Sequence, residues 1–100
     1  MSTSSAKVLN PTQDLQGPRE SLEIEDWLVD YLVRLLKLEA HEVRTDVRFE
    51  SFGLDSAATV GLTGDLSDWL QMDVDPSLAY DHPTVAALAK HLAAELAKAR

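Results

Sequence analysis

The feature that most constrains the fold is an apolar stripe at helical spacing between residues 24 and 36. Seven side chains recur every three or four residues, namely Ile24, Trp27, Leu28, Tyr31, Leu32, Leu35 and Leu36. This spacing places all seven on one face of an α-helix, so it predicts an amphipathic helix of roughly four turns. Ser21 is placed to cap its start, and Arg34 and Lys37 fall in its last turn, where the helix dipole favours positive charge.

A second helix is predicted to begin at Asp55 or Ser56 and to run to about Met72. Its inward-facing set, again at helical spacing, is Thr59, Leu62, Leu66, Trp69 and Leu70. Val60 lies on the flank of this set, and Gly61 and Gly64 leave the outer face of the helix bare. Each of these glycines costs the helix about 1 kcal/mol relative to alanine.

The C-terminal part of the chain predicts one short and one long helix. Pro76 begins a segment of about one helical turn over residues 77–81, and Pro83 stops it. Thr84 is placed to cap a final helix, with Lys98 and Arg100 at its C-terminal end. The inward-facing side chains of that final helix are Val85, Leu88, Ala89, Leu92 and Leu96.

The remaining segments lack a sustained apolar period. Residues 39–54 are therefore interpreted as a long loop, closed by Gly53 and held by the apolar anchors Val43, Val47, Phe49 and Phe52. Residues 1–20 are polar and predict a flexible N-terminal arm, because they bury too little surface to offset the entropy of ordering. The predicted fold is all-α: a small four-helix bundle over residues 21–100, with three main helices, one short helix and a long first loop.

Composition and charge exclude several functions. The chain has no cysteine, so disulfides, thiolate metal sites and a cysteine nucleophile are excluded. A net charge of −8 argues against nucleic acid as a ligand and favours basic protein surfaces as partners. No apolar run reaches membrane-spanning length, and the N-terminus lacks the apolar region of a secretory signal. We expect a cytoplasmic monomer that does not bind membranes.

No motif for catalysis or metal binding is complete. His41-Glu42 begins like a zinc-protease motif, but Thr45 stands where the second histidine is needed. Asp73 and Asp75 begin like a calcium loop, but the required glycine and glutamate are missing further on. The histidines at 41, 82 and 91 lack the spacing of metal ligands. We therefore predict no catalytic residues and no metal site.

Ser56 stands out because it lies in the first turn of a predicted helix, directly after a loop that ends in glycine. One interpretation is that Asp55 or Ser56 merely caps the helix. The other is that the serine hydroxyl is presented to solvent, where the helix N-terminus favours a phosphate. From residue 49 to residue 89 the chain has seven acidic residues and no Lys or Arg. A single sign of charge over this length favours a docking surface for basic partners, centred on that helix.

Together these residues resemble an acyl carrier protein, most closely the carrier domains of modular polyketide synthases. The resemblance covers roughly residues 21–96, and no gap separates Ser56 from the later motif. It is carried by Gly53-Leu-Asp-Ser56, Val60-x-Leu62, Leu66, Pro76 and Tyr80-Asp-His-Pro-Thr84.

The resemblance implies that Ser56, next to Asp55 in the motif, receives 4′-phosphopantetheine from coenzyme A through a phosphopantetheinyl transferase. The arm ends in a thiol, which carries acyl groups as thioesters for enzymes acting in trans, so the chain itself is implied to be non-catalytic. The implied partners are an acyl-loading enzyme, such as a fatty acyl-AMP ligase or an acyltransferase, and a ketosynthase or other synthase domains. A chain with these ends is expected to be a free-standing carrier or an excised domain.

The second helix is implied to be the docking surface for these partners. Its docking residues are predicted to be Ala57, Val60, Gly61, Asp65 and Asp68. In the family the residue after the serine is usually a larger apolar one, and the position of Gly61 is often glutamate; Asp65 and Asp68 are the candidates to compensate. For Trp69 both core packing and the lining of an acyl groove are considered.

Two alternatives to the acyl carrier remain at this stage. One is a peptidyl carrier of a nonribosomal synthetase, although such carriers tend to have Gly-Gly before the Asp/His-Ser pair, where this chain has Leu54. The other is an acidic helical interaction module without a prosthetic group, in which Ser56 only caps the helix.

Overall fold

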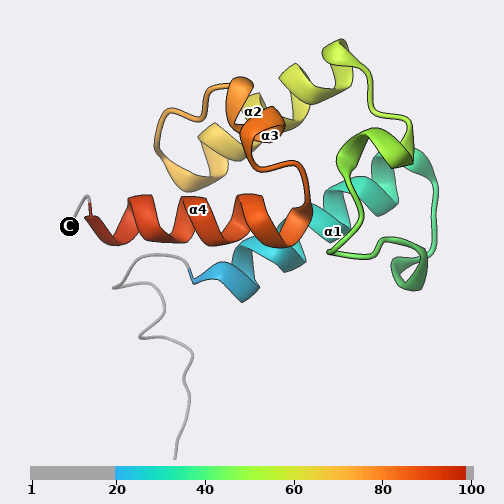
Figure 1. Ribbon diagram of the computed structural model, residues 1–100, viewed down its shortest axis with the longest axis horizontal. Coiled ribbons are helices and arrows are strands. Elements are labelled where there is room, and N and C mark those ends of the chain that lie inside the picture. Colours follow the sequence, from blue (N-terminus) through green and yellow to red (C-terminus); the bar gives the residue numbers. More distant parts are fainter. Residues whose placement is uncertain (1–19, 99–100) are drawn as a thin grey trace, which may run out of the picture.

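The computed structural model describes residues 20–98 and contains, within them, the predicted helices (Figure 1). The elements follow in the order α1 (Ser21–Leu36), η2 (Ala40–Glu42), η3 (Phe49–Phe52), α2 (Ser56–Leu70), α3 (Ser77–Asp81) and α4 (Val85–Lys98). The α elements are the three main helices that the periodicity predicted and the short one predicted between Pro76 and Pro83, so the fold prediction is confirmed. The predicted N-terminal arm lies outside the described residues, apart from Glu20.

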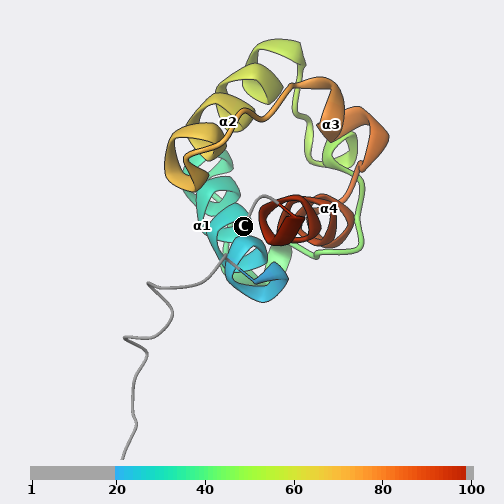
Figure 2. The same cartoon turned by 90° about the vertical axis from the view of Figure 1, so that its left-hand side faces the viewer.

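The helices surround one apolar core, with the short α3 between α2 and α4 (Figure 2). α1 packs most extensively against α4. The stripe on α1 contributes Ile24, Leu28 and Leu32, which are fully buried, and each such side chain contributes about 1.5–3 kcal/mol by leaving water. The other buried apolar side chains are Val43, Phe49, Leu62, Leu66, Leu70, Val74, Ala79, Val85, Leu88, Ala89 and Leu92.

The core departs from the predicted one at four positions: Leu35 is exposed, while Thr63, Val74 and Ala79 are buried although the periodicity did not assign them to the core. Leu35, predicted to face inward, is 43% exposed, because the stripe of α1 drifts out of the interface in its last turn. Thr63 was not predicted to be buried, yet it is. Its hydroxyl donates to the carbonyl of Thr59 at 3.0 Å, which satisfies the polar group inside the core.

The helix starts are capped differently from one another. The predicted cap at Ser21 is wrong: Ser21 is already helical, and Glu20 is the cap residue without a side-chain hydrogen bond. The prediction for Thr84 is confirmed, because its Oγ1 accepts a hydrogen bond from the N–H of Ala87 at 3.0 Å. Lys37 lies just beyond the last turn of α1, in a left-handed conformation.

The first loop is held to the start of α4 by backbone hydrogen bonds. The N–H of Phe49 donates to the carbonyl of Pro83 at 2.7 Å, and the N–H of Ala86 donates to the carbonyl of Thr45 at 3.0 Å. Of the predicted anchors, Phe49 and Val43 are buried, while the other two are half-buried. Sequence periodicity did not predict η2 and η3, because each spans about one turn. These contacts fix the segment that leads into α2.

Candidate functional site

The chain turns into α2 through Gly53. This glycine ends η3 in a left-handed conformation with φ 86°, and its N–H donates to the carbonyl of Glu50 at 3.0 Å. Residues with a side chain rarely adopt this conformation, so glycine is the residue that permits the turn. The turn places residues 54–56 between the anchored loop and the first turn of α2.

Asp55 caps α2, and Ser56 does not. The Asp55 carboxylate accepts a hydrogen bond from the N–H of Ala58 at 2.8 Å, and the Asp55 carbonyl accepts another from the hydroxyl of Thr59 at 2.9 Å. Ser56 is the first residue of the helix and is exposed. Among the residues that the structure describes, none forms a hydrogen bond with the Ser56 hydroxyl. The predicted cap of α2 is therefore confirmed for Asp55 and wrong for Ser56, and Ser56 is exposed to solvent.

The surroundings of Ser56 suit a phosphate but do not activate the serine. At a helix start the first N–H groups have no acceptor within the helix; Asp55 satisfies that of Ala58 and leaves those of Ser56 and Ala57 to other acceptors. Within residues 20–98 no base is hydrogen-bonded to the Ser56 hydroxyl.

The five predicted docking residues all lie on the exposed side of α2. Ala57, Gly61, Asp65 and Asp68 are exposed, and Val60 is 55% exposed although it is apolar. Their spacing of three or four residues places them on adjoining turns of one face. The structure thus brings the candidate docking residues together on the helix that begins with Ser56.

An aromatic stack joins α1 to α2 beside this face. Trp69 stacks on Trp27, and Trp27 stacks on Tyr31, with ring centroids 5.2 Å apart in both pairs. Trp69 is half-buried, so its role in the structure is packing between helices. The Tyr31 hydroxyl donates to Asp65 Oδ2 at 2.8 Å. Burial raises the pKa of Tyr31, and so do the hydrogen bond to Asp65 and its negative charge, against a smaller effect of Arg34.

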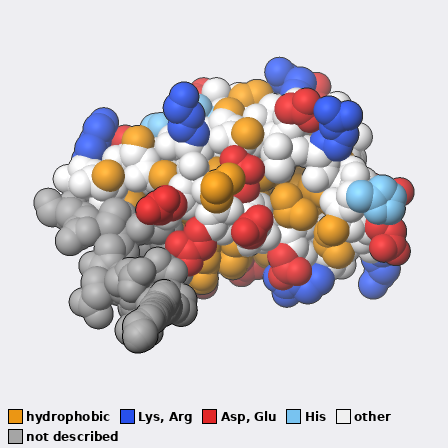
Figure 3. Space-filling model, turned by 90° about the horizontal axis from the view of Figure 1, so that it is seen from below, with side chains coloured by type: hydrophobic (Ala, Val, Ile, Leu, Met, Phe, Trp, Pro, Cys, Tyr) orange, Lys and Arg blue, Asp and Glu red, His pale blue; other side chains and the backbone are white. Residues whose placement is uncertain are grey.

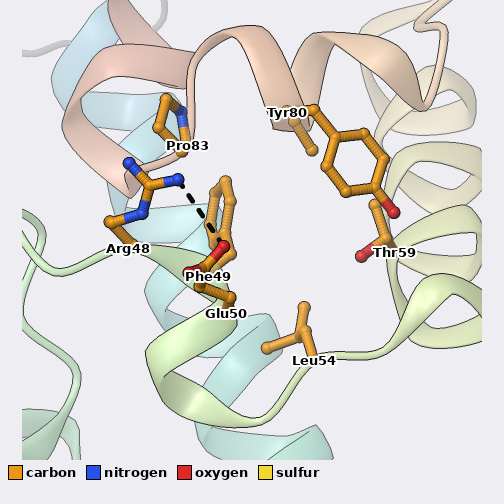
Figure 4. Close-up of a pocket in the computed structure, with 8 residues that line it drawn as sticks. Arg48, Phe49, Glu50, Leu54, Thr59, Tyr80 and Pro83 are labelled. Carbon is orange, nitrogen blue, oxygen red and sulfur yellow. Dashed lines mark ion pairs between the residues drawn. The ribbon is translucent and has the colours of Figure 1, made fainter.

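A pocket lies between the first loop, the start of α2 and the segment from α3 to α4 (Figure 4). Its volume is about 350 Å³ including the open mouth. Apolar side chains form much of its wall, and an exposed ion pair between Arg48 and Glu50, 3.5 Å long, forms part of its lining. Leu54 and Thr59, which flank Ser56 in the sequence, also line it. The full lining is Arg48, Phe49, Glu50, Leu54, Thr59, Ala79, Tyr80 and Pro83.

Acidic side chains are numerous on the surface, but they are not gathered into a metal site. Within residues 20–98 no three or more His, Asp or Glu side chains lie close enough together to hold a metal ion. Figure 3 shows one face, on which acidic side chains lie among hydrophobic ones while Lys and Arg lie towards its margins. His82 and His91 stack on each other with ring centroids 4.2 Å apart, and His41 is exposed. None of the helices in this part of the chain is long and apolar enough to cross a membrane.

The sequence predicted Ser56, Asp55 and the outer residues of α2 as site candidates, whereas it did not predict the bond of Tyr31 to Asp65 or the pocket. Tyr31 was assigned only to the apolar stripe of α1, because no local signal links it to an acid on another helix. The pocket combines residues from the first loop, α2 and the segment before α4, which are distant in the sequence.

Comparison with known proteins identifies a family. Residues 26–92 match the family described as "Phosphopantetheine attachment site". The chain is 32% identical over 73 residues to the acyl carrier protein TtuC of Teredinibacter turnerae, covering 73% of this chain and 84% of TtuC. It is 39% identical over 72 residues to one subunit of the phenolphthiocerol/phthiocerol polyketide synthase of Mycobacterium tuberculosis; this match covers 72% of the chain and only 4% of that much longer protein.

The fold has a close counterpart among solved structures. The crystal structure of a free-standing peptidyl carrier protein from Acinetobacter baumannii superposes with a TM-score of 0.73 and 30% sequence identity. The superposition covers 77% of this chain and 96% of the other. The solution structure of Asl1650, an acyl carrier protein from Anabaena sp. PCC 7120, superposes with a TM-score of 0.74 and 29% identity over 80% of this chain and 91% of the other, so the fold is common to an acyl and a peptidyl carrier.

Proposed function

The chain belongs to the phosphopantetheine attachment-site family of carrier proteins, and on that premise we propose that the Ser56 hydroxyl carries the 4′-phosphopantetheine arm. The observation that supports this proposal is the division of roles at the start of α2. Asp55 supplies the side-chain cap of α2, so the neighbouring serine is left exposed and available. Covalent decoration of Ser56 would therefore break no hydrogen bond of the fold.

The residues around Ser56 fit a phosphodiester. The N–H groups of Ser56 and Ala57 point out of the helix N-terminus, which favours a negative charge at this position. In the attachment step the serine oxygen would form a P–O bond to the pantetheine-bearing phosphorus of coenzyme A, while the diphosphate P–O bond to the nucleotide breaks. The serine proton would pass to a base of the transferase, and 3′,5′-ADP would leave. When bound, the arm supplies a thiol for thioester formation, which a chain without cysteine cannot supply itself.

The chain is a carrier homologous to those of polyketide synthases, and we propose that it acts in trans with separate enzymes. These are a phosphopantetheinyl transferase, an acyl-loading enzyme such as a fatty acyl-AMP ligase or an acyltransferase, and a ketosynthase or another synthase domain. All of them would dock on the exposed face of α2, where Asp65 and Asp68 attract basic side chains. The absence of Lys and Arg between residues 49 and 89 leaves no like charge to repel such partners on this helix.

A peptidyl carrier is the second candidate function. The superposition with the peptidyl carrier from A. baumannii favours it, whereas TtuC and the polyketide synthase relative favour an acyl carrier. The third interpretation, an interaction module in which Ser56 only caps the helix, is disfavoured because Asp55 is the cap.

Intact-mass spectrometry tests the attachment site. After incubation with coenzyme A and a promiscuous phosphopantetheinyl transferase, the wild-type chain is expected to gain the mass of one phosphopantetheine group. Ser56→Ala is expected to gain none. Ser51→Ala is a matched control, because it removes another exposed serine hydroxyl close by in the sequence and is expected to load normally. A wild-type chain that remains unmodified would refute the proposal, and so would a loaded Ser56→Ala variant.

A further inference from the structure

Tyr31 of α1 reaches the exposed face of α2 at the point where α2 lacks a side chain. A Cβ atom at Gly61 would lie 3.8 Å from the Tyr31 hydroxyl, an ordinary van der Waals distance. The same hydroxyl donates to Asp65 Oδ2, one turn further along α2, at 2.8 Å. The docking face is therefore composite: a hydroxyl from α1 lies beside the bare turn at Gly61 and holds the next carboxylate.

Asp65 and Asp68 differ in how freely their side chains move. Both are exposed acids on α2. Within residues 20–98, the Asp65 carboxylate has a side-chain partner in Tyr31, whereas no hydrogen bond or ion pair involves the Asp68 carboxylate. Only one oxygen of Asp65 is engaged by the hydroxyl, so the other can accept from a Lys or Arg of a partner. Asp65 thus combines an available oxygen with a fixed orientation.

We propose that Tyr31 is a positioning residue of the docking surface: its hydroxyl holds the Asp65 carboxylate in the orientation in which a basic side chain of a partner enzyme binds it. This inference rests on the proposed function, because it requires a partner that docks on α2. Immobilising a side chain on binding has an entropic cost, and a carboxylate that is already held avoids part of it. Removing the hydroxyl should therefore weaken docking without changing the chemistry at Ser56.

The aromatic stack makes a clean variant available. Tyr31→Phe removes the hydroxyl and keeps the ring that stacks on Trp27, so the packing of α1 against α2 is retained. A purely structural role of the hydroxyl would change the melting temperature alone. A positioning role changes the KM for the carrier while kcat is retained, and this change requires the carboxylate of Asp65.

The experiment measures transfer from coenzyme A to the apo carrier by a phosphopantetheinyl transferase at low ionic strength, with the carrier concentration varied. Asp65→Asn is expected to raise KM. Tyr31→Phe is expected to raise KM about three-fold, near the lower end of what immobilising one side chain contributes, with kcat retained. In the double variant Tyr31→Phe/Asp65→Asn, loss of the hydroxyl should add nothing to the effect of Asp65→Asn. Tyr31→Phe/Asp68→Asn is the matched control, in which the two effects should multiply.

Three outcomes would overturn the inference. They are a KM for Tyr31→Phe no higher than that of the wild type, an equal rise in KM in the Asp65→Asn background, and an Asp65→Asn variant with unchanged KM. Far-UV circular dichroism confirms that each variant is folded before the kinetics are compared. The proposed function fails separately, because its failure is a wild-type chain that gains no phosphopantetheine at all, whereas failure of the inference leaves wild-type loading intact.

Discussion

Replacing Asp55 by alanine should destabilise the fold more than replacing Ser56, although Ser56 is the residue proposed to carry the arm. Asp55→Ala removes the acceptor of the Ala58 N–H, a hydrogen bond of 2.8 Å at the start of a 15-residue helix. Loss of an N-cap costs about 1 kcal/mol, within a range of about 0.5–2. In a domain of this size, a loss of about 1 kcal/mol lowers the melting temperature by about 4–8 °C.

The comparison with Ser56→Ala and Asp55→Asn makes this prediction sharp. Ser56→Ala removes a hydroxyl that has no hydrogen-bond partner among the described residues, so its effect should stay within about 0.5 kcal/mol of zero. Asp55→Asn retains a side-chain oxygen that can cap, so it should retain most of the stability. The measurement is thermal unfolding of the apo proteins followed by far-UV circular dichroism. If Ser56→Ala lowered the melting temperature as much as Asp55→Ala, the serine would share the cap, and the division of roles at the helix start would be refuted.

Three further predictions concern glycines, pH and charge. Gly53→Ala should destabilise the fold by about 1–2 kcal/mol through its positive φ alone, because no atom lies within 4 Å of the added Cβ. Gly64→Ala should stabilise the fold by about 1 kcal/mol, because it adds a better helix former in open space. Urea titration measures both changes. Folding raises the pKa of Tyr31, so the stability linked to this group is fully present below its unfolded pKa of about 10 and is lost as the pH rises through the folded value. Over this alkaline range the urea midpoint of Tyr31→Phe should therefore fall less than that of the wild type. Asp68→Lys should slow transferase loading at low salt, and the difference from the wild type should shrink as salt is added; equal rates at low salt would contradict a docking role for this acid.

Local sequence signals predicted most of the fold. The apolar stripes of α1, α2 and α4 placed the three main helices, and the proline-bounded segment placed α3. Errors arose where a tertiary contact decides the outcome. Leu35 continues the stripe of α1 but lies beyond the packed interface. Thr63 is covered by neighbouring elements, and its hydroxyl tolerates burial because it donates to the carbonyl of Thr59 in the same helix. Periodicity reports which residues share a face, and it does not report where that face stops being covered.

For the candidate site, too, the sequence predicted what local patterns determine and did not predict contacts between distant residues. Ser56, Asp55 and the exposed residues of α2 follow from a short motif and from helical spacing, so the sequence was enough to predict them. The hydrogen bond between Tyr31 and Asp65 joins residues 34 positions apart on two helices, and no local sequence pattern predicts that these two side chains meet. The choice between Asp55 and Ser56 as the cap was also open until the hydrogen bond to Ala58 was known.

One face of α2 packs in the core, and the opposite face, on which we propose that partners dock, is exposed. The inner face contributes Leu62, Leu66 and Leu70 to the core, while the outer face carries Val60 and small or acidic residues that lie outside the core. A partner can therefore cover the whole outer face without competing with packing. The serine proposed to carry the arm takes no part in capping, so loading and unloading should change the free energy of unfolding little. If several enzymes dock in turn on the outer face of α2, as proposed, this separation would let each of them bind without any rearrangement of the core-facing side of the helix.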